Sequence, residues 1–273
     1  MKIAVLSGKG GTGKTFVSVN LACAFSQSTY VDCDVEEPNG HVFLKPKNIT
    51  SQDVFVALPT FDETKCIGCK KCVEFCHFNA LIYIRKKPIV FPEICHSCGG
   101  CQLVCDQEAI QETQHAIGRV EIGFHDHVRC VTGWINPGEV SGIPVIEKAL
   151  HVAEDENVVV DCPPGSACSV MESIQNADVC LLVVESSVFG FHNFKMVYEL
   201  ATLLNKPCKV IINKMHEEYE PLETFCKEHQ IDVIARIPYS QSMATLTSNG
   251  HIAYEEDEGM KQMFDSILRE VVA

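Results

Sequence analysis

The sequence predicts an α/β protein whose mostly parallel sheet has helices on both faces, with a small α+β domain inserted into it. Short apolar runs alternate with amphipathic stretches over most of the 273 residues, which is typical of parallel strands joined by helices. A glycine-rich run separates the first apolar run from the first amphipathic stretch. The segment 60–112 breaks the alternation, is dense in cysteine and contains an internal repeat. We therefore expect one discontinuous domain over residues 1–59 and 113–273 and an inserted domain over residues 60–112.

The composition limits the classes of protein and of partner. Hydrophobic residues make up 46% of the chain and charged residues 21%, as in globular proteins. The net charge of −14 argues against a nucleic-acid partner and against stable binding to an anionic membrane, because both kinds of binding need a basic surface. The first apolar run is too short for a signal peptide, and no run approaches the roughly 20 residues of a membrane span. Sixteen cysteines in such a chain predict bound metal and a reducing, cytoplasmic location.

The first strand, loop and helix predict a phosphate-binding unit. Residues 2–7 form an apolar run, expected to be a buried strand, and residues 15–26 have helical periodicity. Between them, Gly8-Lys9-Gly10-Gly11-Thr12-Gly13-Lys14-Thr15 matches the P-loop motif G-x-x-x-x-G-K-S/T in the setting that the motif requires. The loop N–H groups would cradle phosphates, Lys14 would reach the β- and γ-phosphates, and Thr15 would bind Mg²⁺. The sequence thus predicts a P-loop NTPase fold that binds ATP or ADP with Mg²⁺.

Two further strands end in aspartates. The run 29–34 ends in Asp32 and Asp34, and the run 158–161 ends in Asp161, with Gly165 four residues later. An aspartate at a strand end can also cap a helix. Three such carboxylates beside a P-loop favour a catalytic role instead.

The inserted segment carries two cysteine runs of identical spacing, 29 residues apart. They are Cys66-x2-Cys69-x2-Cys72-x3-Cys76 and Cys95-x2-Cys98-x2-Cys101-x3-Cys105. This is the spacing of bacterial ferredoxins with two 4Fe–4S clusters, in which the fourth cysteine of each run ligates the other cluster. One cluster would be held by Cys66, Cys69, Cys72 and Cys105, and the other by Cys95, Cys98, Cys101 and Cys76. The alternative is a pair of zinc sites or loose thiols, although zinc sites usually have two ligand pairs separated by a longer spacer.

The rest of the chain continues the alternation. Apolar runs predict strands at 179–185, 209–213 and 233–237. Amphipathic stretches predict helices at 142–155, 168–176, 190–205 and 218–229. A closing helix is expected at 255–271, because its acidic start is favourable at a helix N-terminus.

The order of these motifs resembles the MinD/ParA/Mrp superfamily of P-loop ATPases, and in particular members that contain an inserted ferredoxin domain. Lys9, the second lysine of the loop, matches the deviant P-loop of this class and of the nitrogenase iron protein. The resemblance implies that Lys9 reaches across a dimer to the nucleotide of the partner, either a second copy or a related ATPase. A lysine with only local phosphate contacts is the alternative.

The same resemblance implies roles for residues at the strand ends. Asp34 would position the attacking water, Asp161 would hold Mg²⁺ through a water molecule, and Gly165 would sense the γ-phosphate through its N–H. Asp32 would support Mg²⁺ or the loop. The weaker matches are two residues that would contact the adenine, Asn213 and Pro238, although an asparagine at a strand end is also a common turn residue.

Cysteines outside the insert raise one more possibility. Cys168 falls seven residues after Asp161, at the offset where the nitrogenase iron protein places a ligand of its intersubunit cluster, and Cys130 lies upstream at a similar offset. A third cluster between two subunits is one interpretation, and an ordinary thiol at a helix start is the other. His125-x-His127-x2-Cys130 also has metal-like spacing, although histidines in a polar loop are more often solvated.

We expect an ATPase that couples its nucleotide state to electron transfer through two 4Fe–4S clusters. Lys9 and Lys14 would neutralise charge while Asp34 places the water, because phosphoryl transfer needs positioning more than covalent chemistry. Hydrolysis would release two switch segments and reorient the inserted domain. The partner would be a redox protein or an iron–sulfur acceptor. The alternative is a scaffold or carrier ATPase for iron–sulfur or metal-cofactor assembly, whereas a MinD-like positioning ATPase is disfavoured because residues 268–273 are too short for a membrane-targeting helix.

Overall fold

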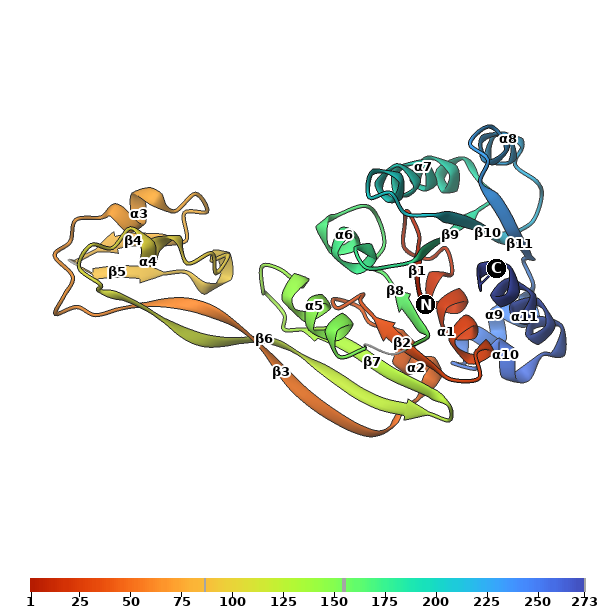
Figure 1. Cartoon of the computed structure of the whole chain (residues 1–273), viewed down its shortest axis with the longest axis horizontal. Coiled ribbons are helices and arrows are strands. Elements are labelled where there is room, and N and C mark those ends of the chain that lie inside the picture. The colour runs from red at the N-terminus through yellow and green to blue at the C-terminus, as the bar shows by residue number, and fades with distance from the viewer. Residues whose placement is uncertain (86, 154–155, 273) are drawn as a thin grey trace.

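The computed structural model describes residues 1–85, 87–153 and 156–272. Figure 1 shows a large α/β body, a two-stranded arm that leaves it, and a small cysteine-rich unit (residues 62–109) at the end of the arm. Within the described residues nine strands form one sheet. In order across the sheet they are β11 (Asp232–Pro238), β10 (Cys208–Met215), β9 (Val179–Glu185), β1 (Lys2–Leu6), β8 (Val158–Asp161), β2 (Ser28–Asp32), β7 (Val128–Ile135), β6 (Ile110–His125) and β3 (Lys47–Phe61).

Most of this sheet is parallel, as the sequence predicts. The strands from β11 to β7 all pair in parallel. The edge differs, because β6 pairs antiparallel with β7 and β3 pairs antiparallel with β6. The sequence pattern does not predict β3, because most of its side chains are exposed and no apolar alternation marks its first half.

Helices cover both faces of the sheet. On one face lie α1 (Lys14–Ala24), α2 (Gly40–Leu44), α10 (Ala253–Glu256) and α11 (Glu258–Val272), and on the other lie α5 (Ile143–His151), α6 (Cys168–Ile174), α7 (Val188–Leu203) and α8 (Glu220–Glu228). Alternate residues of β1 pack into the hydrophobic cores on the two faces of the sheet, because successive strand side chains point to opposite faces. Ile3 and Val5 pack with Phe264 of α11, whereas Ala4 and Leu6 pack with Phe194 of α7. None of the helices in the described stretches is long and apolar enough to cross a membrane.

Several predicted elements end elsewhere in the structure. The strand expected over 29–34 ends at Asp32, so Asp34 lies in the loop after it. The helix expected over 142–155 is α5 and ends at His151, and the last two residues of that prediction lie outside the described residues. The closing helix is divided into α10 and α11. Asp257 separates them because its backbone is extended and its carboxylate accepts the N–H of Met260 at 2.8 Å, which caps α11.

The arm is the part of β3 and β6 that extends beyond β7. The pairing of β6 with β7 ends at Gly118, and the next residue toward the arm, Ile117, has no partner in the register between β6 and β3. This β-bulge lies where the arm leaves the body (Figure 1). Bulges bend a strand and increase its twist, so the bulge sets the direction of the arm.

The cysteine-rich unit consists of two similar halves. Its elements are α3 (Lys71–Phe75), β4 (Leu81–Ile84), β5 (Lys87–Val90), the short 3-10 helix η1 (Pro92–Ile94) and α4 (Gly100–Leu103). The N–H of Asp62 donates to Ala109 O, and the N–H of Phe91, 29 positions later, donates to Ala80 O, both at 2.8 Å. Positive φ angles repeat at the same offset, in the pairs Gly68 and Ser97, Lys70 and Gly99, and Asn79 and Glu108. Each half therefore bonds to the other in the same way, as a pseudo-twofold repeat requires.

Candidate functional site

A cavity of about 550 Å³ lies over the carboxyl ends of the central strands. This volume is within the range of small-molecule sites. It collects residues that are far apart in the sequence, and the predicted site residues that line it are Gly10, Gly11, Gly13, Lys14, Thr15, Asp34, Asn213 and Pro238. Helix α9 (Gln241–Ser248) forms part of the wall through Met243, Ala244, Thr247 and Ser248. Sequence reasoning did not assign α9 to the site.

The loop before α1 has the backbone that a phosphate cradle needs. Gly13 precedes the helix with a φ of 92°, in the left-handed region. A Cβ at this position would lie 2.1 Å from Nδ2 of Asn213, so a side chain would collide as well as strain the backbone. Asn213 in turn donates from Nδ2 to Thr12 O at 2.8 Å. The predicted adenine residue Asn213 therefore also holds the loop in place.

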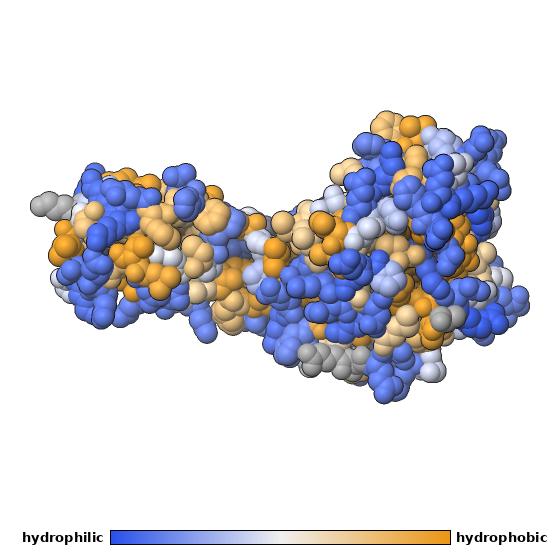
Figure 2. Space-filling view, turned by 45° about the horizontal axis from the view of Figure 1, so that its top comes forward, coloured by the Kyte–Doolittle hydropathy of each residue, from blue (hydrophilic) through white to orange (hydrophobic). Residues whose placement is uncertain are grey.

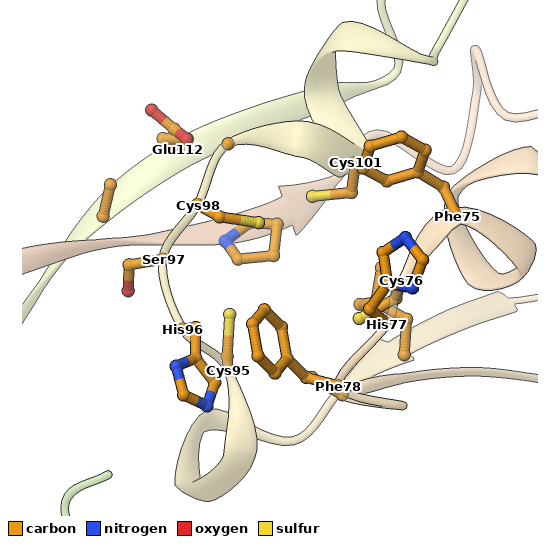
Figure 3. Close-up of a pocket in the computed structure, with 15 residues that line it drawn as sticks. Phe75, Cys76, His77, Phe78, Cys95, His96, Ser97, Cys98, Cys101 and Glu112 are labelled. Carbon is orange, nitrogen blue, oxygen red and sulfur yellow. The ribbon is translucent and has the colours of Figure 1, made fainter. Parts of the chain in front are cut away.

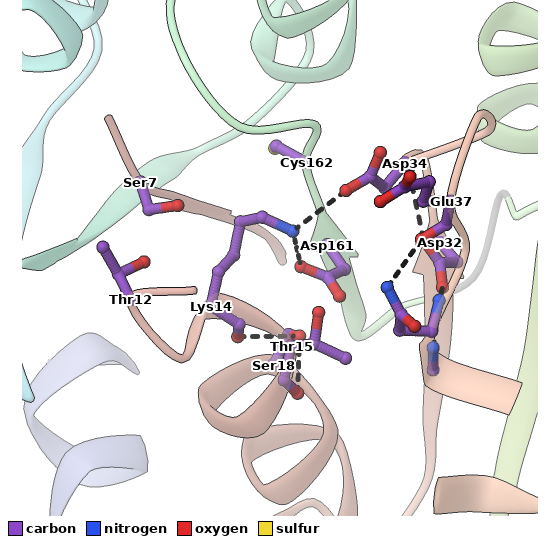
Figure 4. A network of polar contacts seen from close by, with 12 residues as sticks. Ser7, Thr12, Lys14, Thr15, Ser18, Asp32, Asp34, Glu37, Asp161 and Cys162 are labelled. Atoms are coloured by element: carbon purple, nitrogen blue, oxygen red, sulfur yellow. Dashed lines mark hydrogen bonds and ion pairs between the residues drawn. The ribbon is translucent and has the colours of Figure 1, made fainter. Parts of the chain in front are cut away.

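Lys14 lies buried between two of the predicted aspartates (Figure 4). Its Nζ is 2.6 Å from Oδ1 of Asp161 and 4.0 Å from Oδ2 of Asp34. Burial has the largest single effect and would lower the pKa of Lys14, but the charge and hydrogen bond of Asp161 together with the charges of Asp32 and Asp34 outweigh it and raise the pKa. Burial raises the pKa of Asp34 to about 6, against the opposing effect of Lys14. The structure thus brings the lysine and both carboxylates together, although Asp161 itself does not line the cavity.

Asp32 supports the loop that carries Asp34. Its carboxylate accepts the backbone N–H groups of Asp34 at 3.2 Å, Asn39 at 3.0 Å and Gly40 at 2.9 Å. Tyr30 donates its hydroxyl to Oδ2 of Asp161 at 2.8 Å, and that hydroxyl lies 3.4 Å from Oδ2 of Asp32. Sequence reasoning missed Tyr30. Its position two residues before Asp32, on the same face of β2, is the feature that could have identified it.

Two residues predicted to act on phosphate have other partners here. The ammonium of Lys9 forms an ion pair with Glu185 at 2.6 Å, on the same chain. The N–H of Gly165 donates to Ser7 O at 2.9 Å. Neither Lys9 nor Gly165 lines the cavity, and the same is true of Gly8 and Thr12. These contacts would have to exchange for Lys9 and Gly165 to take the predicted roles.

The eight cysteines of the insert line two separate cavities. One is lined by Cys76, Cys95, Cys98 and Cys101 (Figure 3), and the other by Cys66, Cys69, Cys72 and Cys105. In Figure 3 the four labelled thiols surround one common space. The fourth cysteine of each run therefore faces the first three of the other run. This is the crossed grouping that the spacing predicts.

The donor set of each cavity fits an iron–sulfur cluster better than a zinc ion. Thiolates are soft ligands that suit both. Zinc holds sulfur at about 2.3 Å, so two ligands of one ion lie less than about 4.6 Å apart. Among the described residues, the only group of three possible metal ligands within 4.8 Å of one another contains no cysteine. No three thiols of the described residues are therefore as close together as the ligands of one zinc ion.

Cys130 and Cys168 are not brought together within the chain. Cys130 is 2% exposed and packs in the core on the side of α1 and α11. Cys168 is exposed at the start of α6, on the other side of the sheet. A buried thiol cannot reach a cluster on the surface, so this structure does not support a shared cluster at Cys130 and Cys168.

Comparisons with known proteins agree with this fold. The family model of the CobQ/CobB/MinD/ParA nucleotide binding domain matches residues 3–253. The septum site-determining protein MinD of Pyrococcus horikoshii, solved as a complex with Mg-ADP, has a TM-score of 0.61 and 17% identity, with 99% of this chain and 95% of that chain covered. At that identity the similarity shows the fold alone.

Two proteins of Methanocaldococcus jannaschii are related to this chain by sequence. In Methanocaldococcus jannaschii, the uncharacterized protein MJ0579 is 28% identical over 221 residues, which cover 78% of this chain and 80% of the relative. The uncharacterized protein MJ0578 of the same organism is 27% identical over an alignment of 277 residues, covering 98% and 96%. A component of an ion-translocating oxidoreductase complex of Methanosarcina acetivorans is 39% identical over 49 residues, only 18% of this chain and 19% of that component.

Proposed function

Because the chain belongs to the family of CobQ/CobB/MinD/ParA nucleotide-binding domains, we propose that it is an Mg²⁺-dependent ATPase whose nucleotide state controls electron transfer by an inserted two-cluster ferredoxin-like domain. One observation carries this proposal. The loop 136–142 lies against Val35, the residue after Asp34, on one side and contacts the arm on the other, and it lines a groove together with the cysteine-rich unit. We infer that a change at the nucleotide is passed along these contacts to the arm that carries the cysteines.

The hydrolytic step uses residues that line the cavity or lie just behind it. Lys14 would bind the β- and γ-phosphates, and Thr15 together with Asp161 would hold Mg²⁺, which when bound supplies positive charge against the phosphates. Asp34 orients the attacking water, because its carboxylate is part-buried and borders the cavity. Lys9 completes the site of a second copy or of a related ATPase once it leaves Glu185. Asn213 and Pro238 border the space for the base.

The path begins at Val35, the residue after Asp34. Val35 O accepts the N–H of Ile135 at 3.1 Å, and the side chain is 4% exposed. Its methyl groups fill the space above two glycines: an added Cβ would lie 2.7 Å from Val35 at Gly133 and 2.5 Å from it at Gly142. Because protein interiors do not deform freely, a shift of Asp34 must displace the loop that these glycines flank.

The loop 136–142 then holds the root of the arm. Asn136 donates its backbone N–H to Ile117 O at 2.8 Å and its side-chain amide to Ala116 O at 3.0 Å. Glu139 binds His115 of the arm, with 2.9 Å between Oε1 and Nε2. These contacts lie at the β-bulge, where the arm can bend. Movement of the loop would therefore turn the arm.

The same loop borders the cysteine-rich unit. A groove of about 410 Å³ is lined by Glu139 and Ser141 of the loop region and by Cys95 and His96 of the unit. The two cysteine sets would hold two 4Fe–4S clusters, which when bound carry single electrons at low potential. Figure 2 shows apolar side chains gathered on this unit, and the most exposed ones include Ile67 at 69% and Leu103 at 87%. They offer a surface to a redox protein or an acceptor protein.

The test is metal analysis and EPR on full-length protein prepared without oxygen. We expect about eight iron and eight sulfide per chain, as two 4Fe–4S clusters require. The EPR spectrum of the reduced protein should differ between ADP and a non-hydrolysable ATP analogue. Lys14→Ala should keep the iron and lose both hydrolysis and the spectral difference. Zinc or no metal would contradict the cluster assignment. EPR spectra that are the same with either nucleotide would contradict the coupling of the clusters to the nucleotide state.

A scaffold or carrier ATPase for iron–sulfur assembly is the second candidate. It is favoured by the exposure of Cys69 and Cys98, one in each set, because an exposed thiol lets an acceptor reach a cluster. Transfer of iron and sulfide to an apo-acceptor, accelerated by ATP, would support the carrier. Clusters that stay bound through many turnovers while electrons are delivered would support the electron-transfer function.

A further inference from the structure

Three possible metal ligands meet at the β6–β7 turn, at the end of β6 opposite the arm and away from the nucleotide cavity and the cysteine-rich unit. His125 and Asp126 lie at the turn between β6 and β7, and Glu255 lies on α10. Nε2 of His125 is 2.9 Å from Oε1 of Glu255. One ligand atom from each of the three residues lies within 4.8 Å of the other two. Within the described residues no other set of three histidine, cysteine or carboxylate side chains is this close.

We propose that His125, Asp126 and Glu255 form a binding site for a divalent transition-metal ion such as Zn²⁺. One imidazole and two carboxylates are ligands that Zn²⁺ accepts, and the imidazole selects it over Mg²⁺ and Ca²⁺. Zinc–nitrogen and zinc–oxygen distances are about 2.0–2.2 Å, so two ligands of one ion lie at most about 4.4 Å apart. The observed span exceeds that by little, and rotation of the exposed Asp126 and Glu255 side chains closes it.

The surroundings favour a cation. Helix α1 ends here, since His127 of the same turn donates from Nε2 to Cys23 O at 3.1 Å. The last turn of α1 contains no basic residue, so the negative end of its dipole is not balanced within the helix. Cys23, whose carbonyl accepts from His127, and Cys130 are each 2% exposed. Both thiols are buried in the core, so the proposed ligand set is nitrogen and oxygen alone.

A bound ion would fasten the β6–β7 turn to α10. The turn is the end of β6 opposite the cysteine-rich unit, so the ion would stiffen the strand from which the arm extends (Figure 1). This inference is independent of the ATPase and cluster assignments, because it uses none of their residues.

The chain offers a matched control in a second histidine–glutamate pair. His251 Nδ1 lies 3.1 Å from Oε1 of Glu256, the residue next to Glu255, and the pair belongs to no group of three ligands in the described part of the chain. His251→Ala therefore removes a similar exposed ion pair and no metal site. Asp126→Asn keeps a residue type that tolerates the positive φ at this position and should fold normally.

The experiment is calorimetric titration of full-length protein with Zn²⁺, followed by Co²⁺ spectroscopy. The wild type should bind one equivalent more than His125→Ala, and Asp126→Asn and Glu255→Gln should weaken that equivalent by more than about tenfold, since even outer-shell changes cost this much. His251→Ala should bind like the wild type. The Co²⁺ difference spectrum between wild type and His125→Ala should show weak visible bands without thiolate charge transfer. If all four variants bound Zn²⁺ with the same stoichiometry as the wild type, the proposed site would be wrong and His125 and Glu255 would form an ion pair only. A thiolate band in the Co²⁺ difference spectrum would show that the ligand set is wrong.

Discussion

Lys9 and Glu185 of the same chain form an ion pair, with 2.6 Å between Nζ and Oε2. Lys214 lies 3.5 Å from the other carboxylate oxygen of Glu185. The lysine that we propose to act on a second nucleotide is therefore bound within its own chain by a residue at the end of β9. Assembly of the proposed dimeric site would require this pair to break.

Breaking the pair should favour assembly. Glu185→Gln should raise ATP turnover at low protein concentration by up to about fivefold, because a partly exposed ion pair is worth at most ~1 kcal/mol and 1.4 kcal/mol is tenfold. Turnover is measured across a range of protein concentrations. Glu223→Gln on α8, which breaks the pair with Arg236 of β11, is the control and should behave like the wild type. If Glu185→Gln left both the rate and its concentration dependence unchanged, the pair would not limit assembly.

The buried Asp32 predicts how stability depends on pH. Burial and then the charge of Asp161 raise the pKa of Asp32 to about 7, whereas an unfolded aspartate ionises near 3.9. Between these values the folded protein keeps a proton that the unfolded chain has lost. The stability that Asp32 contributes is therefore full below about pH 4 and is lost as the pH rises through about 7.

Asp32→Asn should remove this part of the pH dependence. Denaturant unfolding of the wild type should show a loss of stability between about pH 4 and about pH 7 that the variant lacks, since asparagine does not ionise there. Glu223→Gln serves again as the control. Parallel pH profiles for wild type and Asp32→Asn would show that Asp32 is already ionised in the folded protein.

The crossed grouping of cysteines predicts which cysteine substitutions remove iron from the same cluster. A variant with serine at Cys66, Cys69 and Cys72 should retain about half of the iron, because one complete ligand set remains. Adding Cys105→Ser should change nothing further, since Cys105 belongs to the set already lost. Adding Cys76→Ser should remove most of the remaining iron, because Cys76 faces the other set. The opposite order of losses, read by iron analysis, would refute the grouping.

Val35 should transmit the nucleotide state to the arm. Val35→Ala opens a cavity between Gly133 and Gly142 and should lower the free energy of unfolding by roughly 1–3 kcal/mol. Hydrolysis should change less than the EPR response to nucleotide, which should shrink because Asp34 no longer moves the loop 136–142. Val197→Ala on α7, equally buried, is the matched control and should keep the response. A full response in Val35→Ala would place the path elsewhere.

Much of the fold follows from local pattern. The alternating runs predict the parallel strands and the helices on both faces, because each is a contiguous stretch whose period reveals its geometry. The edge of the sheet cannot be predicted from local pattern, because β3 and the outer part of β6 are exposed along much of their length and carry no apolar stripe. The break at Asp257 does not follow either, since an aspartate within an acidic run can begin a helix at several positions.

The sequence by itself determined the motifs from which we propose the chemistry, because the P-loop, the aspartates and the cysteine runs are each recognised by spacing within a short stretch of chain. Only the tertiary structure decided how they are joined. It placed Tyr30 between two aspartates, Val35 between two glycines, and Glu185 on Lys9, and it brought His125 to Glu255. The physical reason is that such contacts depend on the order of strands in the sheet and on what packs on each face, and residues more than a hundred positions apart carry no local signal that they will meet.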